Sequence, residues 1–148
     1  MTTYIHQQVE QARAGCLPSL ICRMASGWAV MCNMQFLSGY TILLPDPVAG
    51  SLNDLTRQQR ADYLCDMALI GDALLEVTGA YRINYGIMGN SDPALHAHIV
   101  PRYLDEPETL LHGLPWSYPQ EEINSLRFDA ERDANLMRRL AEAVKQRG

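Results

Sequence analysis

The chain has 148 residues, of which 47% are apolar and 20% charged, an ordinary balance for a soluble globular domain. This composition excludes collagen-like and intrinsically disordered chains, and apolar runs such as residues 41–44 are too short to span a bilayer. The formal net charge of −5 argues against an extended nucleic-acid surface, although it allows one phosphate group to be held locally.

The first half of the chain predicts one helix and three strands. Residues 4–14 carry apolar side chains at helical intervals and are followed by Gly15, which favours a short amphipathic helix. Residues 20–24 and 28–32 are β-prone runs on either side of a short turn, so they predict an antiparallel hairpin. Residues 40–44 predict a third strand that ends at a proline-rich turn.

A long helix is predicted next. Thr56 and Gln59 form a T-x-x-Q capping box at its start, and Gly79 is the expected left-handed stop. Its predicted buried stripe, with members three or four residues apart, is Leu64, Met67, Ala68, Gly71, Leu74, Leu75 and Thr78.

The remaining elements are two strands and a final helix. Residues 81–85 and 95–100 predict the fourth and fifth strands, the latter ending at Pro101. Residues 105–120 contain three prolines and predict an ordered loop. Residues 130–146 predict a helix with this buried stripe: Leu136, Met137, Leu140, Ala143 and Val144.

Strands and helices do not alternate one for one along this chain. We therefore predict an α+β fold with a mainly antiparallel sheet of five or slightly more strands and a long central helix. No linker or repeat divides the sequence, so residues 1–148 are expected to form a single domain.

The redox state and cellular location are predicted from two further features. The first eleven residues are polar and lack the apolar run of a signal peptide, which favours a cytoplasmic protein with no membrane partner. Free thiols are expected at the four cysteines, since none belongs to a C-x-x-C pair. These are Cys16, Cys22, Cys32 and Cys65.

Residues 89–102 carry the chemistry. His96 and His98 are two residues apart on the predicted fifth strand, so their rings share one face of it. The preceding turn, residues 89–93, is rich in side chains and amides that donate hydrogen bonds. Donors beside neutral imidazoles form a plausible seat for a phosphate group.

Two other interpretations of the histidine pair remain open. Both rings can be structural, each satisfied by a hydrogen-bond partner within the strand environment. A metal site needs a third or fourth ligand, and none stands at a characteristic spacing. A structural or metal-holding protein is therefore the third functional class to test.

Residues 94–102 resemble the signature of the histidine triad (HIT) superfamily, in which three histidines alternate with apolar residues before Pro-Arg. In an alignment on this Pro-Arg pair, His96 takes the middle position, which attacks the α-phosphorus in the family. His98 takes the third position, which contacts the phosphate and the leaving group. Arg102 itself is expected at the surface.

The resemblance extends over about residues 28–103 and implies further contacts. Asn90 and Ser91 match the family's Gly-Gln-Ser/Thr, which implies that they bind phosphate oxygens. Asn33 lies near the family's ribose-contacting residue. Trp116, in the appended C-terminal tail, either covers the base and ribose or packs its own loop.

Two positions depart from the family pattern. Ala94 replaces the first triad histidine, and Tyr40 replaces the histidine that usually follows the glycine before the third strand. Loss of both together suggests a variant site, in which the attacking histidine is retained.

The resemblance implies a nucleotide hydrolase or nucleotidyl transferase that forms a covalent nucleotidyl-histidine at the α-phosphate and needs no metal or other cofactor. The alternative is a nucleotide-binding module with little or no turnover, because Ala94 and Tyr40 replace usual histidines. The family also commonly forms homodimers, so a homodimer is expected here.

Overall fold

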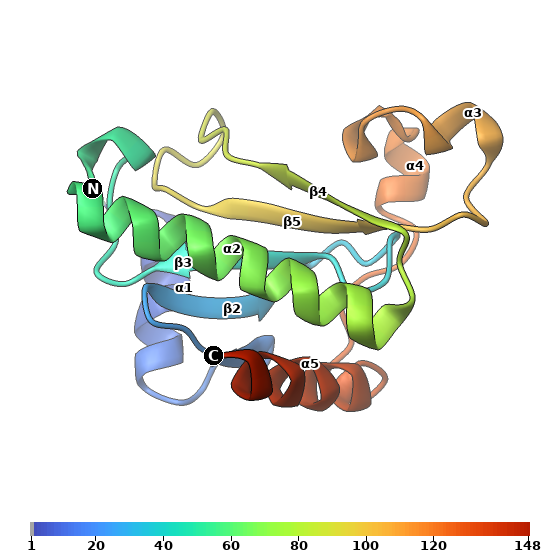
Figure 1. Cartoon of the computed structure of the whole chain (residues 1–148). Coiled ribbons are helices and arrows are strands. Elements are labelled where there is room, and N and C mark those ends of the chain that lie inside the picture. Colours follow the sequence, from blue (N-terminus) through green and yellow to red (C-terminus); the bar gives the residue numbers. More distant parts are fainter. Residues whose placement is uncertain (1) are drawn as a thin grey trace.

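A five-stranded antiparallel sheet organises residues 2–148, the part of the chain described by the computed structural model (Figure 1). The strands lie in the order β1-β2-β3-β5-β4, and every neighbouring pair is antiparallel. They are β1 (Leu20–Arg23), β2 (Gly27–Met31), β3 (Thr41–Pro45), β4 (Arg82–Gly86) and β5 (Ala97–Arg102). The predicted α+β class and antiparallel sheet are confirmed.

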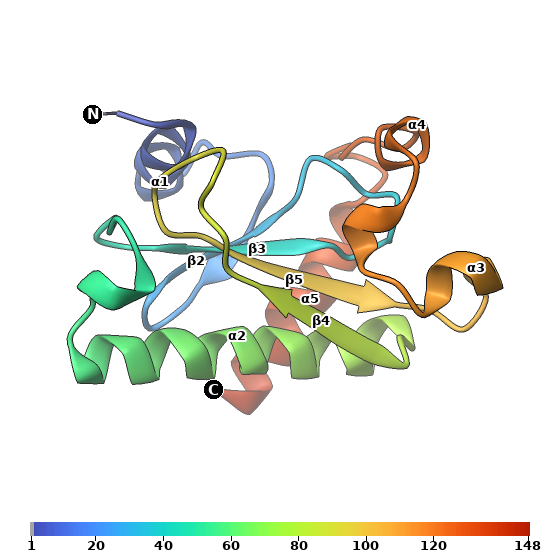
Figure 2. The same ribbon diagram turned by 90° about the horizontal axis from the view of Figure 1, so that it is seen from above.

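Helices cover both faces of the sheet. The long helix α2 (Arg57–Thr78) and α5 (Ala134–Arg147) pack on one face, whereas α1 (Tyr4–Arg13) and α4 (Gln120–Ile123) lie on the other (Figure 2). The remaining short elements are η1 (Leu52–Asp54), α3 (Glu108–Leu111) and η2 (Pro115–Ser117).

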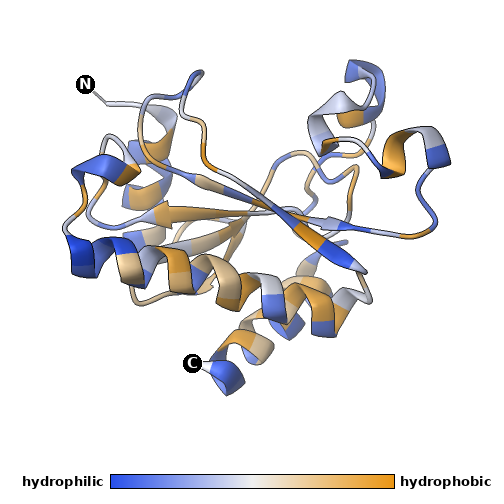
Figure 3. Ribbon diagram, turned by 45° about the horizontal axis from the view of Figure 1, so that its top comes forward, coloured by the Kyte–Doolittle hydropathy of each residue, from blue (hydrophilic) through white to orange (hydrophobic). Residues whose placement is uncertain are grey.

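The sheet separates two apolar cores. On β3, Leu43 points into the core beneath α2 and α5, while Ile42 and Leu44 point into the core beneath α1. All five β3 residues are therefore buried, which explains the uninterrupted apolar run in the sequence. Figure 3 shows apolar residues along the inner strands of the sheet, and apolar residues that alternate with polar ones along α2.

The ends of α2 agree with the prediction, but its buried face agrees only in part. Thr56 and Gln59 form the capping box, and Gly79 ends the helix at φ +74°. Met67, Gly71 and Leu74 are buried as predicted. The other buried residues are Tyr63, Asp66, Ile70 and Ala73. Leu64 and Leu75, predicted to be buried, are 43% and 40% exposed.

Partners on other elements decide which face of α2 is buried. Tyr63 donates its hydroxyl hydrogen to the carbonyl of Leu43 on β3, and Asp66 accepts hydrogen bonds from the amide and hydroxyl of Ser26. These bonds rotate the helix so that polar side chains with partners face the sheet. Helical periodicity alone does not reveal such partners.

Strand β5 begins and ends later than predicted. It runs from Ala97 through Pro101 to Arg102, so His96 stands immediately before it. The predicted stop at Pro101 was wrong because β3, which begins at Thr41, no longer flanks β5 at this point. The missing N–H of the proline therefore interrupts no ladder on that side.

The proline-rich segment 105–120 is not a plain loop. Pro107 and Pro119 directly precede the short helices α3 and α4, and Pro115 opens η2, positions where no backbone N–H is needed. The final helix begins at Ala134, four residues later than predicted. Asp129 holds the preceding turn, because its carboxylate accepts the backbone N–H groups of residues 131 and 132.

Two sequence-based expectations concern the whole chain. The four cysteines are free thiols, as predicted. Within residues 2–148, no helix combines the length and the apolar character needed to cross a membrane.

Candidate functional site

The two histidines lie together on the α1 side of the sheet. His98 is on β5 and His96 immediately precedes it, with their ring centroids 5.0 Å apart. Leu95, Ala97 and Ile99 point into the opposite core. The prediction that the two rings share one side of the strand is confirmed.

Backbone geometry orients the ring of His96. Its Nδ1 lies 2.8 Å from the carbonyl oxygen of Ala94. Because a carbonyl only accepts, Nδ1 carries the hydrogen and Nε2 retains a lone pair in the neutral ring. The side chain is partly exposed. His96 therefore has the tautomer and the accessibility that a nucleophile requires.

Asp92 stabilises the turn that precedes His96. No role for Asp92 was predicted from the sequence. One carboxylate oxygen accepts the N–H of Ala94 at 3.0 Å, and the other accepts the N–H of Ile5 in α1 at 3.2 Å. The turn is thereby tied to the N-terminal helix. The signal in the sequence was the Asp-Pro pair, since aspartate commonly bonds the backbone two residues later.

His96 lies between two cavities. One, of about 190 Å³, is lined by residues of α1 and by the segment after β2, including Tyr4 and Asn33. The other, of about 330 Å³, lies between residues 50–53 and the turn that contains Gly89 and Pro93. Asn33, which donates a hydrogen bond to the Tyr4 hydroxyl at 3.2 Å, is thus brought to the same cavity as His96.

His98 has a different environment. Its Nδ1 lies 2.6 Å from the hydroxyl oxygen of Tyr40, and its ring packs edge-on against Trp116 at 5.5 Å between centroids. Trp116 in turn donates its indole N–H to the same Tyr40 oxygen at 3.2 Å. Burial, followed by the neighbouring His96, lowers the pKa of His98 to about 4. His98 is therefore neutral at pH 7.

Solved structures identify this architecture. A histidine triad protein from Sinorhizobium meliloti has a TM-score of 0.71 and 22% identity, over 90% of this chain and 93% of its own. A hypothetical histidine triad nucleotide-binding protein from Sulfolobus tokodaii has a TM-score of 0.72 and 13% identity, over 95% and 92%. The chain has the histidine triad fold. No protein-family model and no curated protein matches the sequence.

Within the HIT fold, the two departures from the motif have clear structural consequences. Ala94 is buried, and its carbonyl rather than its side chain serves the site. Tyr40 is fully buried, immediately precedes β3, and contacts His98 through its hydroxyl group. The variant residues thus contribute to the hydrogen bonding of both histidines.

The predicted phosphate ligands lie beside the second cavity. Asn90 and Ser91 are exposed in the turn between Gly89 and Pro93, both of which line that cavity. No hydrogen bond joins either side chain to another described residue, and their phosphate contacts remain predictions. Trp116 lies against His98 and over Gly86, where an added Cβ would lie 3.0 Å from the indole; it lines neither cavity.

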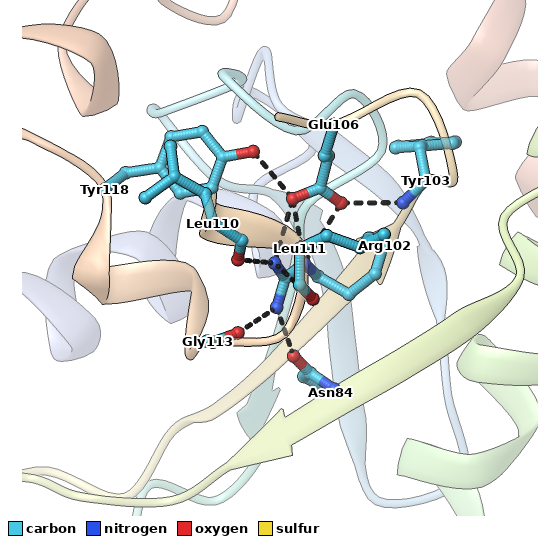
Figure 4. A network of polar contacts seen from close by, with 8 residues as sticks. All are labelled: Asn84, Arg102, Tyr103, Glu106, Leu110, Leu111, Gly113 and Tyr118. Atoms are coloured by element: carbon cyan, nitrogen blue, oxygen red, sulfur yellow. Dashed lines mark hydrogen bonds and ion pairs between the residues drawn. The ribbon is translucent and has the colours of Figure 1, made fainter. Parts of the chain in front are cut away.

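Arg102 was expected at the surface, but this prediction was wrong. It is 2% exposed and forms a 2.8 Å ion pair with Glu106, and it donates to the carbonyls of Leu110 and Gly113 and to Asn84 (Figure 4). Burial alone would raise the pKa of Glu106, but hydrogen bonds from Arg102 and Tyr118 hold this pKa below its usual value. The network fastens the segment that carries Trp116 to β5.

A metal centre does not fit the residues present. One HIT neighbour, from Mycobacterium smegmatis, is described as zinc-bound; it has 18% identity and a TM-score of 0.66, over 97% of this chain and 99% of its own. Here residues 2–148 contain no group of three or more His, Cys, Asp or Glu side chains able to hold a metal ion. Ala94 offers no side-chain ligand beside His96 and His98.

Proposed function

We propose that this protein is a nucleotide hydrolase or nucleotidyl transferase in which His96 attacks the α-phosphate of a nucleoside 5′-phosphate derivative. The main support is the hydrogen bond from His96 Nδ1 to the Ala94 carbonyl, which leaves Nε2 free to attack. The position of His96 between two cavities provides room for a nucleoside on one side and a leaving group on the other.

The reaction would proceed in two displacements. The Nε2 lone pair of His96 forms an N–P bond while the bond from phosphorus to the leaving group breaks, and its electron pair departs with that group. The Ala94 carbonyl stabilises the positive charge that develops on the ring. Water or another acceptor then attacks phosphorus, and the N–P electron pair returns to His96.

The nucleoside is assigned to the smaller cavity. Asn33 and Tyr4 present polar groups there, next to the apolar side chains of Met31 and Ile42. This combination suits a ribose and a planar base. Asn90, Ser91 and their amides are assigned to the phosphate oxygens, and His98 donates a further hydrogen bond. Trp116 lies against His98 and does not line this cavity, so it is not assigned to the nucleoside.

A nucleotide-binding module with little or no turnover is the second candidate. The replacement of two usual histidines by Ala94 and Tyr40 favours it, since neither the alanine methyl nor a buried phenol is an effective proton donor at neutral pH.

Adduct trapping separates the two candidates. The purified protein would be incubated with labelled adenosine phosphoramidate, ADP and dinucleoside polyphosphates, and the acid-labile nucleotidyl-histidine would be mapped by mass spectrometry. If the protein is the proposed enzyme, we expect an adduct on His96. The His96→Ala variant should form no adduct and should remain folded. Unchanged turnover in His96→Ala would refute the assignment. A nucleotide-induced thermal shift without any adduct would favour the binding module.

A homodimer is also proposed, with α2 and β4 as its interface. Leu64, Ala68 and Leu75 recur along one exposed side of α2, and Tyr85 of β4 packs its hydroxyl against Gly71 within this line. β4 is an edge strand of the sheet, and exposed Tyr81 continues the apolar surface. An apolar helix face beside an open sheet edge is suited to a symmetric contact between two copies.

A further inference from the structure

Trp116, Tyr40 and His98 form a directed chain of hydrogen bonds. An indole N–H can only donate, so Trp116 occupies one lone pair of the Tyr40 oxygen at 3.2 Å. His98 Nδ1 lies 2.6 Å from the same oxygen, within reach of the single hydroxyl hydrogen of Tyr40. When Nδ1 accepts this hydrogen, the proton of the neutral His98 ring resides on Nε2, on the side opposite to Tyr40.

Neutral groups surround these three hydrogen-bonded side chains. Tyr40 is fully buried, and burial raises the pKa of its hydroxyl far above neutrality. The nearby Cys32 is also a neutral thiol, because burial raises its pKa to about 11. The remaining titratable neighbour is His96, whose ring centroid is 5.0 Å from that of His98. No carboxylate stabilises a charged His98 through a direct hydrogen bond among the residues that the structure describes.

We propose that Tyr40 is a positioning residue that, with Trp116, fixes His98 as a neutral Nε2–H donor, so that the site selects phosphoanhydrides over phosphoramidates. This inference rests on the proposed function and names its substrate class. A phosphoanhydride releases a phosphate oxyanion: the P–O bond breaks, the electron pair stays on oxygen, and a hydrogen bond from His98 suffices to stabilise it.

A phosphoramidate makes a different demand. When the P–N bond breaks, the electron pair goes to nitrogen, and the departing amine must receive a proton. If His98 gave up its Nε2 proton, Nδ1 would have to take the hydroxyl proton of Tyr40. That transfer would leave a buried tyrosinate with no cation bonded to it, which is strongly unfavourable. His98, held by Tyr40, therefore donates a hydrogen bond to the leaving group but does not readily transfer a proton to it.

The tautomer of His98 tests the positioning role without any substrate. In ¹⁵N-resolved NMR spectra of the wild-type protein near pH 7, we expect the proton on Nε2 and an unprotonated Nδ1. Tyr40→Phe should give a mixture of both tautomers. Trp116→Phe, which retains an aromatic ring and the Tyr40 hydroxyl, should shift the populations less. A proton on Nδ1 in the wild type, or an unchanged tautomer in Tyr40→Phe, would overturn the assignment.

Tyr63→Phe is the matched control. Tyr63 is also a buried tyrosine and donates to a backbone carbonyl at 2.7 Å, but it lies on α2 on the opposite side of the sheet. Its loss should lower stability while leaving the His98 tautomer and the kinetics unchanged. The same change in both variants would mean that Tyr40 acts only through packing.

Substrate selectivity tests the second half of the proposal. ADP and adenosine 5′-phosphoramidate share the nucleoside and the α-phosphate but release phosphate and ammonia, respectively. We expect kcat/KM to favour ADP by about 10²-fold or more, the usual contribution of an effective general acid that the amine lacks here. Tyr40→Phe should lower kcat for ADP by about tenfold with little change in KM.

The outcomes distinguish this inference from the proposed function. Equal or faster turnover of the phosphoramidate, with an adduct on His96, would contradict the selectivity and leave the proposed function intact. If neither substrate forms an adduct or is turned over, the proposed function and the selectivity both fail. The wild-type tautomer would then decide the structural role of Tyr40 alone.

Discussion

At the residue scale, the two histidines are separated into different roles by their Nδ1 partners. His96 donates to a backbone carbonyl, which frees its Nε2 lone pair, whereas His98 accepts from Tyr40, which places its proton on Nε2. Histidines that alternate along a strand are compatible with both arrangements, because the hydrogen-bond partner of each ring decides its tautomer.

Protonation of His98 should destabilise the fold in acid. Its pKa is about 4 in the folded protein and near 6.5 when exposed, so the unfolded chain binds more protons between these values. The free energy of unfolding should therefore fall as pH drops from about 6.5 to 4, by at most about 3 kcal/mol. Urea unfolding of wild type and His98→Gln across this range measures the effect; an equal slope in both proteins would contradict it.

Ser91→Ala should slow turnover without abolishing it. The serine hydroxyl is proposed as one donor to the phosphate among several in the turn, and one such donor contributes about 10²-fold to kcat. Steady-state kinetics with ADP would measure the loss. Ser125→Ala, a change at an exposed serine in the C-terminal region, should have no effect on kcat. Equal rates for wild type and Ser91→Ala would remove Ser91 from the site.

At the element scale, the segment between β5 and α5 depends on one buried arginine. Arg102 holds the carbonyls of Leu110 and Gly113 and the carboxylate of Glu106, and Tyr118 donates its hydroxyl hydrogen to the same carboxylate. This network positions Trp116, and through it the hydrogen bond to Tyr40. A connection that looks like a loop in the sequence therefore supports the site.

Arg102→Met should lower the free energy of unfolding by about 3–5 kcal/mol, because it leaves the Glu106 carboxylate buried without its cation. Denaturant unfolding would measure this loss. Arg147→Met is the matched control, since Arg147 and its partner Glu76 are 41% and 49% exposed and such a pair contributes about 1 kcal/mol or less. Similar losses in the two variants would show that the buried network is not stabilising in the proposed way.

At the scale of the whole molecule, α2 carries more apolar side chains than one copy of the protein buries. The monomer covers the face that contains Tyr63 and Ile70 but leaves Leu64 and Leu75 exposed beside β4. A second copy would cover this surface and the open edge of β4 at once.

Leu64→Glu combined with Leu75→Glu should convert the proposed dimer to a monomer, because it places charges on the apolar contact. Analytical ultracentrifugation of the wild type and the variant would measure the masses. Leu104→Glu changes a leucine that is 73% exposed but lies outside this face, and it should remain dimeric. A monomeric wild type would rule out the interface.

Local signals in the sequence were sufficient for the order of the strands and long helices and for the histidine motif, although not for every boundary. The capping box at Thr56, the stop at Gly79 and the strand alternation around His96 and His98 depend on neighbouring residues, so a linear pattern reveals them. The order of elements together with this motif predicted the HIT fold, which the similarity to solved structures confirms.

Long-range contacts decided the rest. The burial of Arg102, the face that α2 presents to the sheet and the contacts of Trp116 and Tyr40 near His98 all depend on partners 18 to 76 residues away in the chain. Side-chain type and spacing do not specify such partners, because a polar group is buried only when the fold brings a complementary group to it.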